Sequence, residues 1–167
     1  MFKKSAAALL ALSLPFTASA NWSLGGGYAN FSDDGDADIS LGAIYGSAAY
    51  HHNVDGTKFS VVPEFRLGTG ISDDEVYGVD VELERFISLS VKGQYDVNEQ
   101  FFVFAMPSYA NAKLKASYGG FSESDDDWEF GYGVGAGFNV SDTSTMEFSF
   151  EQYDDADVLT ASIHFAF

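Results

Sequence analysis

Apolar and polar side chains alternate with a period of two in eight segments of this chain. The clearest is 128–140, where Trp128, Phe130 and Tyr132 alternate with glutamate and glycine. Successive side chains of a strand point to opposite faces of a sheet, so each segment predicts a strand with one apolar face. The expected strands cover 22–31, 39–52, 58–71, 79–95, 101–114, 128–140, 146–153 and 160–167. Segments 39–52 and 101–114 carry apolar residues on both faces, which leaves their orientation open.

The connections between these segments alternate in length and charge. Short polar turns are expected at 53–57, 96–100 and 141–145, and mostly longer, acidic stretches at 32–38, 72–78, 116–127 and 154–157. Outer-membrane barrels have short periplasmic turns and longer extracellular loops. With eight strands, both chain ends fall on the side of the short turns. The pattern therefore predicts an all-β fold, an eight-stranded antiparallel up-and-down transmembrane β-barrel.

The first twenty residues have the three parts of a secretory signal peptide. Lys3 and Lys4 form a short basic segment, an apolar run rich in alanine and leucine follows, and Ala18 and Ala20 give a small-x-small cleavage pattern. We expect 1–20 to be cleaved and 21–167 to form one barrel domain in the bacterial outer membrane. The chain has no cysteine, so neither a disulfide framework nor a lipid-anchored cysteine is expected.

A soluble periplasmic ligand-binding barrel would show the same alternation, with its polar face toward water. The polar face here consists mainly of glycine, serine and alanine with isolated charges. A solvated surface normally carries many charges of both signs, whereas small residues fit the interior of an eight-stranded barrel, which only side chains can fill. The membrane barrel is therefore the preferred interpretation, and the soluble barrel is the alternative.

Two sequence features of the terminal strands point to a known family. The last strand carries a polar residue, Thr160, and two aromatic residues, Phe165 and Phe167, and the first contains Gly-Gly-Gly-Tyr at 25–28. In these features, and in its layout of strands and turns, the chain resembles the small eight-stranded outer-membrane proteins related to OmpA and OmpX. We predict a monomer with a structural or surface-interaction role that contacts outer-membrane lipids and lipopolysaccharide. The resemblance implies that its insertion depends on the barrel-assembly machinery through the last strand.

The net charge of the chain limits the classes of molecule that it can bind. There are 25 acidic and 8 basic residues, a net charge of −17 with histidine neutral. This charge argues against a nucleic-acid partner, because binding to the phosphate backbone needs a basic surface.

Charged residues on the polar faces are predicted to point into the lumen, where ion pairs would fill the barrel and neutralise one another. They are Glu64, Arg66, Glu82, Glu84, Lys92, Glu129, Glu147 and Glu151. Arg85 falls on the apolar face and is expected at a membrane interface. A narrow ion or proton channel is the alternative function for such a set of charges. At the two interfaces an aromatic girdle is expected, formed by Trp22, Tyr28, Tyr45, Tyr95, Trp128 and Phe167.

Acidic residues concentrate in the connections expected outside the cell. Asp34, Asp36 and Asp38 have the spacing of a calcium loop, but Ile39 and Tyr45 stand where an EF-hand needs glycine and glutamate. No metal site and no cofactor are predicted. Weak binding of divalent cations that bridge to lipopolysaccharide is left open as an alternative.

An enzyme that modifies lipid A is the remaining alternative, because such enzymes also occur as eight-stranded barrels, with catalytic histidine and serine toward the outer leaflet. His51, His52 and His164 fall near the periplasmic end of the predicted barrel, and no His-x-Ser sequence accompanies them. We therefore predict no catalytic residue, and we interpret His51 and His52 as interfacial residues.

Overall fold

The computed structural model describes residues 21–32, 40–76, 79–118, 121–154 and 156–167. The predicted signal peptide at 1–20 and the aspartates at 33–38 lie outside the described residues. In the described part of the chain no helix is long and apolar enough to cross a membrane.

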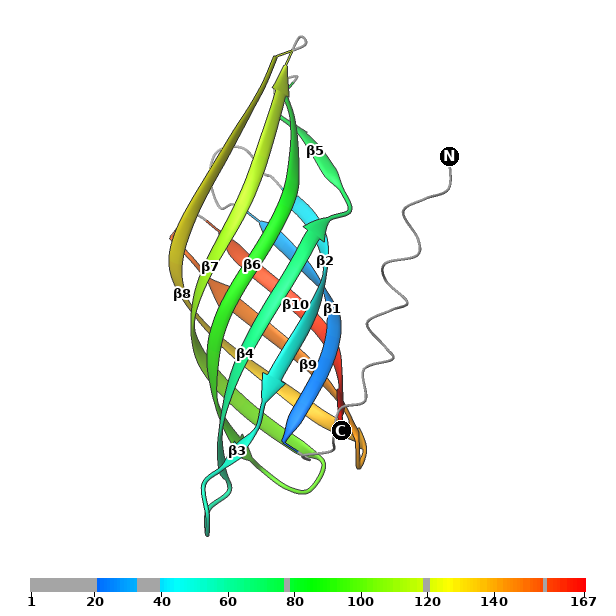
Figure 1. The fold of residues 1–167 in the computed structure, drawn as a ribbon, viewed down its shortest axis with the longest axis vertical. Coiled ribbons are helices and arrows are strands. Elements are labelled where there is room, and N and C mark those ends of the chain that lie inside the picture. Colours follow the sequence, from blue (N-terminus) through cyan, green and yellow to red (C-terminus); the bar gives the residue numbers. More distant parts are fainter. Residues whose placement is uncertain (1–20, 33–39, 77–78, 119–120, 155) are drawn as a thin grey trace.

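In the described residues, ten antiparallel strands form one sheet that closes on itself (Figure 1). β1 pairs with both β2 and β10, and β4 pairs with β6, so eight long strands complete a barrel in which consecutive long strands are neighbours. β3 and β5 are short additions that pair with β4 and β6. The predicted fold is therefore confirmed. The strands are β1 (Trp22–Ser32), β2 (Ser40–Tyr50), β3 (His52–Asn53), β4 (Phe59–Gly70), β5 (Asp73–Val76), β6 (Val79–Asp96), β7 (Phe101–Tyr118), β8 (Phe121–Ser141), β9 (Ser144–Gln152) and β10 (Asp157–Ala166).

The two ends of the barrel differ in height. One end carries the start of β1, the end of β10 and the turns β2–β4, β6–β7 and β8–β9 (lower end in Figure 1). At the opposite end β6, β7 and β8 extend beyond the other strands (Figure 1). We refer to this end as the tall end. These three strands have 18, 18 and 21 residues, and a tilted strand crosses a membrane with about 9–11 residues. β6 and β7 therefore extend on the order of 25–30 Å beyond a membrane-spanning segment, and β8 on the order of 35–40 Å.

At the tall end, two segments that were predicted to be connections contain strands. Residues 116–127 were expected to form a loop, but β7 continues to Tyr118 and β8 begins at Phe121, with Ala116 opposite Glu123 in the ladder. The expected connection at 72–78 likewise contains β5, which pairs with the start of β6. Residues 116–127 are mostly polar and form no apolar face. The periodicity of hydrophobic residues therefore could not predict that the strands extend into this segment. Many of the acidic residues at this end therefore lie on strands.

The outer face of the barrel is apolar and the inner face is mixed. Phe130 is 64% exposed and Leu89 51%, whereas Ala29 and Ser88 are fully buried. These orientations agree with the predicted faces of segments 22–31, 58–71, 128–140 and 146–153. β2 and β7, whose orientations the sequence left open, turn Ala43 and Phe104 inward. A continuous apolar surface around a closed sheet is the surface that a bilayer covers.

Tyr45 is the exception to the predicted girdle, because its side chain lies inside the barrel with 6% exposure. Glycines on both neighbouring strands make space for it: a Cβ atom at Gly27 would lie 2.8 Å from Tyr45 Cζ, and one at Gly68 would lie 2.8 Å from Tyr45 Cβ. The placement of Tyr45 at an interface was therefore wrong.

Candidate functional site

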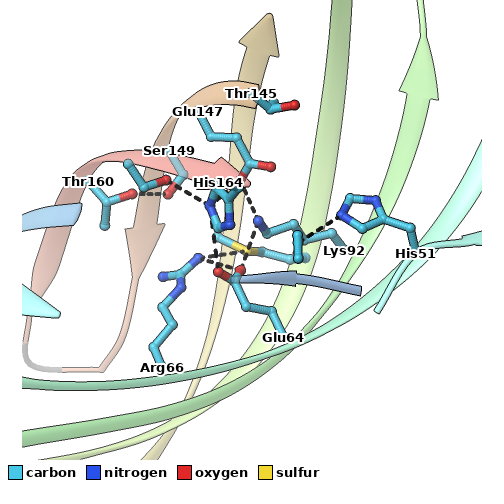
Figure 2. Close-up of polar contacts among 12 residues, drawn as sticks. His51, Glu64, Arg66, Lys92, Thr145, Glu147, Ser149, Thr160 and His164 are labelled. Carbon is cyan, nitrogen blue, oxygen red and sulfur yellow. Dashed lines mark hydrogen bonds and ion pairs between the residues drawn. The ribbon is translucent and has the colours of Figure 1, made fainter. Parts of the chain in front are cut away.

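Five charged side chains meet in the lumen, and Figure 2 shows four of them: Glu64, Arg66, Lys92 and Glu147. Glu64 and Arg66 come from β4, Lys92 from β6, and Glu147 and Glu151 from β9. The strands alternate inward and outward residues, so residues two or four apart on one strand share the inner face. All five are at least 94% buried, as the sequence analysis predicted for them. We refer to these five residues as the lumen cluster.

Ion pairs link the lumen cluster across the barrel. Arg66 Nη1 lies 2.5 Å from Glu151 Oε1, and Arg66 Nη2 lies 3.3 Å from Glu64 Oε2. Lys92 Nζ is 2.8 Å from the same Glu64 oxygen and also pairs with Glu147. Glu64 thus joins the two cations, and strands on opposite sides of the lumen are connected through charge-assisted hydrogen bonds.

Aromatic and polar neighbours complete the packing of the lumen cluster. The Arg66 guanidinium lies 5.5 Å from the ring centre of Tyr45, and Lys92 Nζ lies 5.1 Å from that of Phe104. Tyr153 donates a hydrogen bond of 2.9 Å to Glu151 Oε2. Cation–π contacts of this kind strengthen when water is excluded. These aromatic side chains were not predicted to face the lumen, because an inward aromatic needs small residues opposite it, and only the register shows where they are.

His164 borders the lumen cluster on the side of the termini. Its Nε2 atom lies 3.6 Å from Glu147 Oε2 and 3.0 Å from Ser162 Oγ. This serine–histidine contact was not predicted, although residues two apart on a strand share a face. His52 is exposed, and His51 is half-buried within 3.2 Å of Ser23 Oγ, which points inward.

Two of the predicted lumen residues, Glu82 and Glu84, do not join the lumen cluster. The ladder between β6 and β7 shifts register between Leu83 and Arg85, so Glu84 is an extra residue on β6. Beyond this bulge the faces are exchanged, and Leu83 is buried while Glu82 is exposed. A bulge inverts the inward and outward positions that follow it. The one signal in the sequence was the polar pair at 84–85, with Arg85 on an otherwise apolar face.

Ion pairs on β6 and β7 hold these displaced carboxylates. Glu84 Oε2 lies 2.6 Å from Lys113 Nζ, and Glu82 Oε1 lies 2.8 Å from Lys115 Nζ. The hydrogen bond from Lys113 lowers the pKa of the Glu84 carboxyl, and the hydrogen bond to Glu82 raises the pKa of the Lys115 ammonium. The Glu84 carboxylate and the Lys115 ammonium are therefore charged at neutral pH. Because all four side chains are partly exposed to solvent, the two ion pairs add little to stability.

Glu129, the remaining predicted lumen residue, lines a separate cavity at the tall end of the barrel. Among the described residues, no group of three or more histidine, aspartate and glutamate side chains is placed to hold a metal ion.

The sequence matches the family model of the outer membrane protein beta-barrel domain over residues 5–167. The chain belongs to this family. The transmembrane interpretation is thus confirmed over the soluble alternative, and the apolar outer face lies in outer-membrane lipid. No protein of curated function matches the chain.

Solved structures show the same fold. The attachment invasion locus protein Ail of Yersinia pestis has 21% sequence identity and a TM-score of 0.63, with 87% of this chain and 95% of that chain covered. The N-terminal β-barrel domain of Pseudomonas aeruginosa OprF has 10% identity and a TM-score of 0.65, with 88% and 98% covered. Neisserial surface protein A has 10% identity and a TM-score of 0.62, with 87% and 97% covered. At these identities the likeness shows the fold alone.

Aromatic residues mark both ends of the lipid-facing surface of this outer-membrane barrel. Trp128 stacks on Tyr109 with ring centres 5.0 Å apart, and Trp22 packs edge-on against Tyr50 at 5.1 Å. Four members of the predicted girdle point outward: Trp22, Tyr28, Tyr95 and Trp128. Phe167 follows the last strand, and its backbone N–H donates to the Trp22 carbonyl at 3.1 Å.

Proposed function

We propose that the protein is a monomeric outer-membrane barrel with a structural or surface-interaction role, a closed lumen and an acidic end outside the cell. The lumen cluster carries this proposal. Arg66 and Lys92 are 2% and 1% exposed, and each pairs with carboxylates from two strands. An eight-stranded barrel has room for little more than its own side chains, so these residues leave no continuous path for ions.

The side chains on the outer surface of the barrel indicate which molecules surround it. The outward apolar side chains contact outer-membrane lipids, and the exposed cation Arg85 on the tall end is suited to phosphate groups of lipopolysaccharide. Assembly through the last strand by the barrel-assembly machinery is part of the same proposal. β10 supports it because it pairs with β1 and closes the barrel.

The tall end is the surface that other molecules meet first. Glu123, Asp125, Asp126 and Asp127 lie on its strands, all exposed. The structurally similar protein Ail is named an attachment invasion locus protein. A role of the tall end in surface contacts would agree with that name. The acidic side chains favour cationic partners over nucleic acid or sulfated sugars.

We further propose that the barrel is not an enzyme. In a serine–histidine–carboxylate triad the carboxylate binds the imidazole nitrogen opposite the one that faces the serine. Here Ser162 and Glu147 both approach Nε2 of His164. His164 is also 4% exposed and pairs with the start of β9, near the end of the barrel opposite the tall end. This arrangement supports a packing role for His164.

The closed lumen gives a direct expectation for conductance. The purified barrel in planar bilayers should show no unitary current steps in concentrated KCl, because the lumen cluster blocks the pore. A Lys92→Ala/Phe104→Ala variant should show steps, since it removes two bulky neighbours from the lumen. The matched control is Lys115→Ala, which lies on the tall end and should stay silent. Regular steps from the unmodified protein would instead establish the ion-channel alternative.

A further inference from the structure

The tall end contains a cavity of about 290 Å³ that the structural role does not use. Its walls come from β1, β2, β6, β7, β8 and the β9–β10 connection. Leu83 and Phe86 line it and are 3% and 2% exposed. Phe31 also lines it and meets the Phe86 ring edge-on, with ring centres 5.1 Å apart. Cavities of roughly 300 Å³ and above are the usual size of sites for small molecules.

The bulge in β6 adds to the apolar lining of this cavity. Because Glu84 is the extra residue, Leu83 turns inward and lies opposite Leu114 of β7 in the ladder, and both side chains line the cavity. Without the shift, Glu82 would take the inward place. Bulges next to binding sites commonly re-aim side chains in this way.

One wall of the cavity is acidic. Asp125, Asp127 and Glu129 alternate along β8, and each lines the cavity. They lie opposite Leu114, Ala112 and Ala110 of β7, which supply no positive charge. Among the described residues, no lysine or arginine lines the cavity, and Asp125 and Asp127 have no ion-pair partner.

The positive charges nearby belong to other surfaces. Lys113 and Lys115 alternate with the cavity-lining residues of β7 and pair with Glu84 and Glu82. Tyr153 lines the cavity and donates a hydrogen bond to Glu151 of the lumen cluster. Arg66 is the ion-pair partner of Glu151 and does not line the cavity. The cavity is therefore apolar and aromatic on most sides and negative on one.

We propose that this cavity binds a small organic cation with an apolar body, of the size of an aromatic monoamine. Aromatic rings and carboxylates together are the groups that recognise organic ammonium ions. The acidic wall disfavours fatty-acid and anionic-lipid occupants, because their head groups would approach the carboxylates of Asp125 and Asp127. The proposal goes beyond the structural role and holds whether or not the lumen conducts.

The test uses the complete barrel in lipid nanodiscs and 2-phenylethylammonium as the probe, with backbone amide shifts followed by NMR. Saturable shifts are expected at the cavity-lining residues Leu83, Ala112 and Asp127. Asp125→Asn/Asp127→Asn should weaken binding about fivefold or more at low salt, a modest effect because the carboxylates are exposed. The matched control is Asp126→Asn, which removes a carboxylate that is absent from the cavity lining and 4.0 Å from Arg85. It should leave the affinity within about twofold, since this carboxylate is outside the cavity lining and is partly neutralised by Arg85.

Two further measurements decide the chemistry of the occupant. Ala112→Phe places a ring in the cavity and should abolish the saturable shifts, and 3-phenylpropionate, an anion of similar shape, should not bind. Equal affinity for 2-phenylethanol and the cation would overturn the proposal, because the cavity would then select for apolar bodies alone. An equal loss in Asp126→Asn, or the absence of saturable shifts in the unmodified protein, would also overturn it.

Discussion

Replacing Arg66 with methionine is expected to lower the free energy of unfolding of the barrel by about 3–5 kcal/mol. The change removes the partner of Glu151 at 2.5 Å and one of the two cations that face Glu64. Removing one partner of a buried ion pair leaves a buried charge without compensation, which costs more than the pair itself contributes. Urea unfolding in lipid vesicles, followed by the fluorescence of Trp22 and Trp128, measures the change.

Two controls separate burial from charge. Lys115→Met breaks an ion pair on the tall end in which both side chains are about a third to a half exposed, and it should leave the midpoint of unfolding nearly unchanged. Adding Glu151→Gln to Arg66→Met removes the uncompensated charge and should recover much of the loss. Equal effects of Arg66→Met and Lys115→Met would contradict a dry, closed lumen.

Replacing Gly135 with alanine is expected to destabilise the barrel by about 1–3 kcal/mol, the usual cost of overpacking a filled interior. A Cβ atom there would lie 2.3 Å from Phe104 Cζ and 2.5 Å from the backbone oxygen of Phe148. The Phe104 ring cannot move freely, because it packs against Lys92 in the lumen. The midpoint of urea unfolding in vesicles measures the change.

The matched control is Gly46→Ala on β2, which makes the same chemical change on the exposed outer face. A Cβ atom there would meet its nearest neighbour, the Gly25 backbone oxygen, at 3.9 Å. Its unfolding midpoint should stay the same or rise slightly, because alanine restricts the unfolded chain more than glycine does. A tolerated Gly135→Ala would mean that the lumen is more loosely packed than the structure indicates.

The periodicity of the sequence was sufficient to predict the barrel itself. Where one face was apolar, as at Phe130 and Leu89, orientation followed directly, because a one-residue shift would bury lipid-facing side chains. The buried charges Glu64, Arg66, Lys92, Glu147 and Glu151 were predicted on the same basis. Their partners were not, because partners across the lumen depend on the stagger between strands.

The errors share a physical cause. Glu82 and Glu84 were misplaced because a bulge changes which residues share a face, and no single residue type marks a bulge. Tyr45 was misplaced because its inward orientation depends on Gly27 and Gly68 in neighbouring strands. The strands within 116–127 were taken for a loop because their side chains show no apolar alternation. In each case pairing between strands determined the outcome, and the sequence of one strand does not contain it.

The outward position of the acidic, tall end is tested by labelling single cysteines in intact cells, which is direct because the chain has no cysteine of its own. Ser124→Cys lies on the tall end of β8, and Asp55→Cys lies in the turn between β3 and β4; both positions are exposed. A membrane-impermeant maleimide should label Ser124→Cys in intact cells and Asp55→Cys only after the outer membrane is opened. Labelling of Asp55→Cys alone in intact cells would contradict the proposed orientation. Equal labelling of both variants in a soluble fraction would contradict the membrane barrel itself.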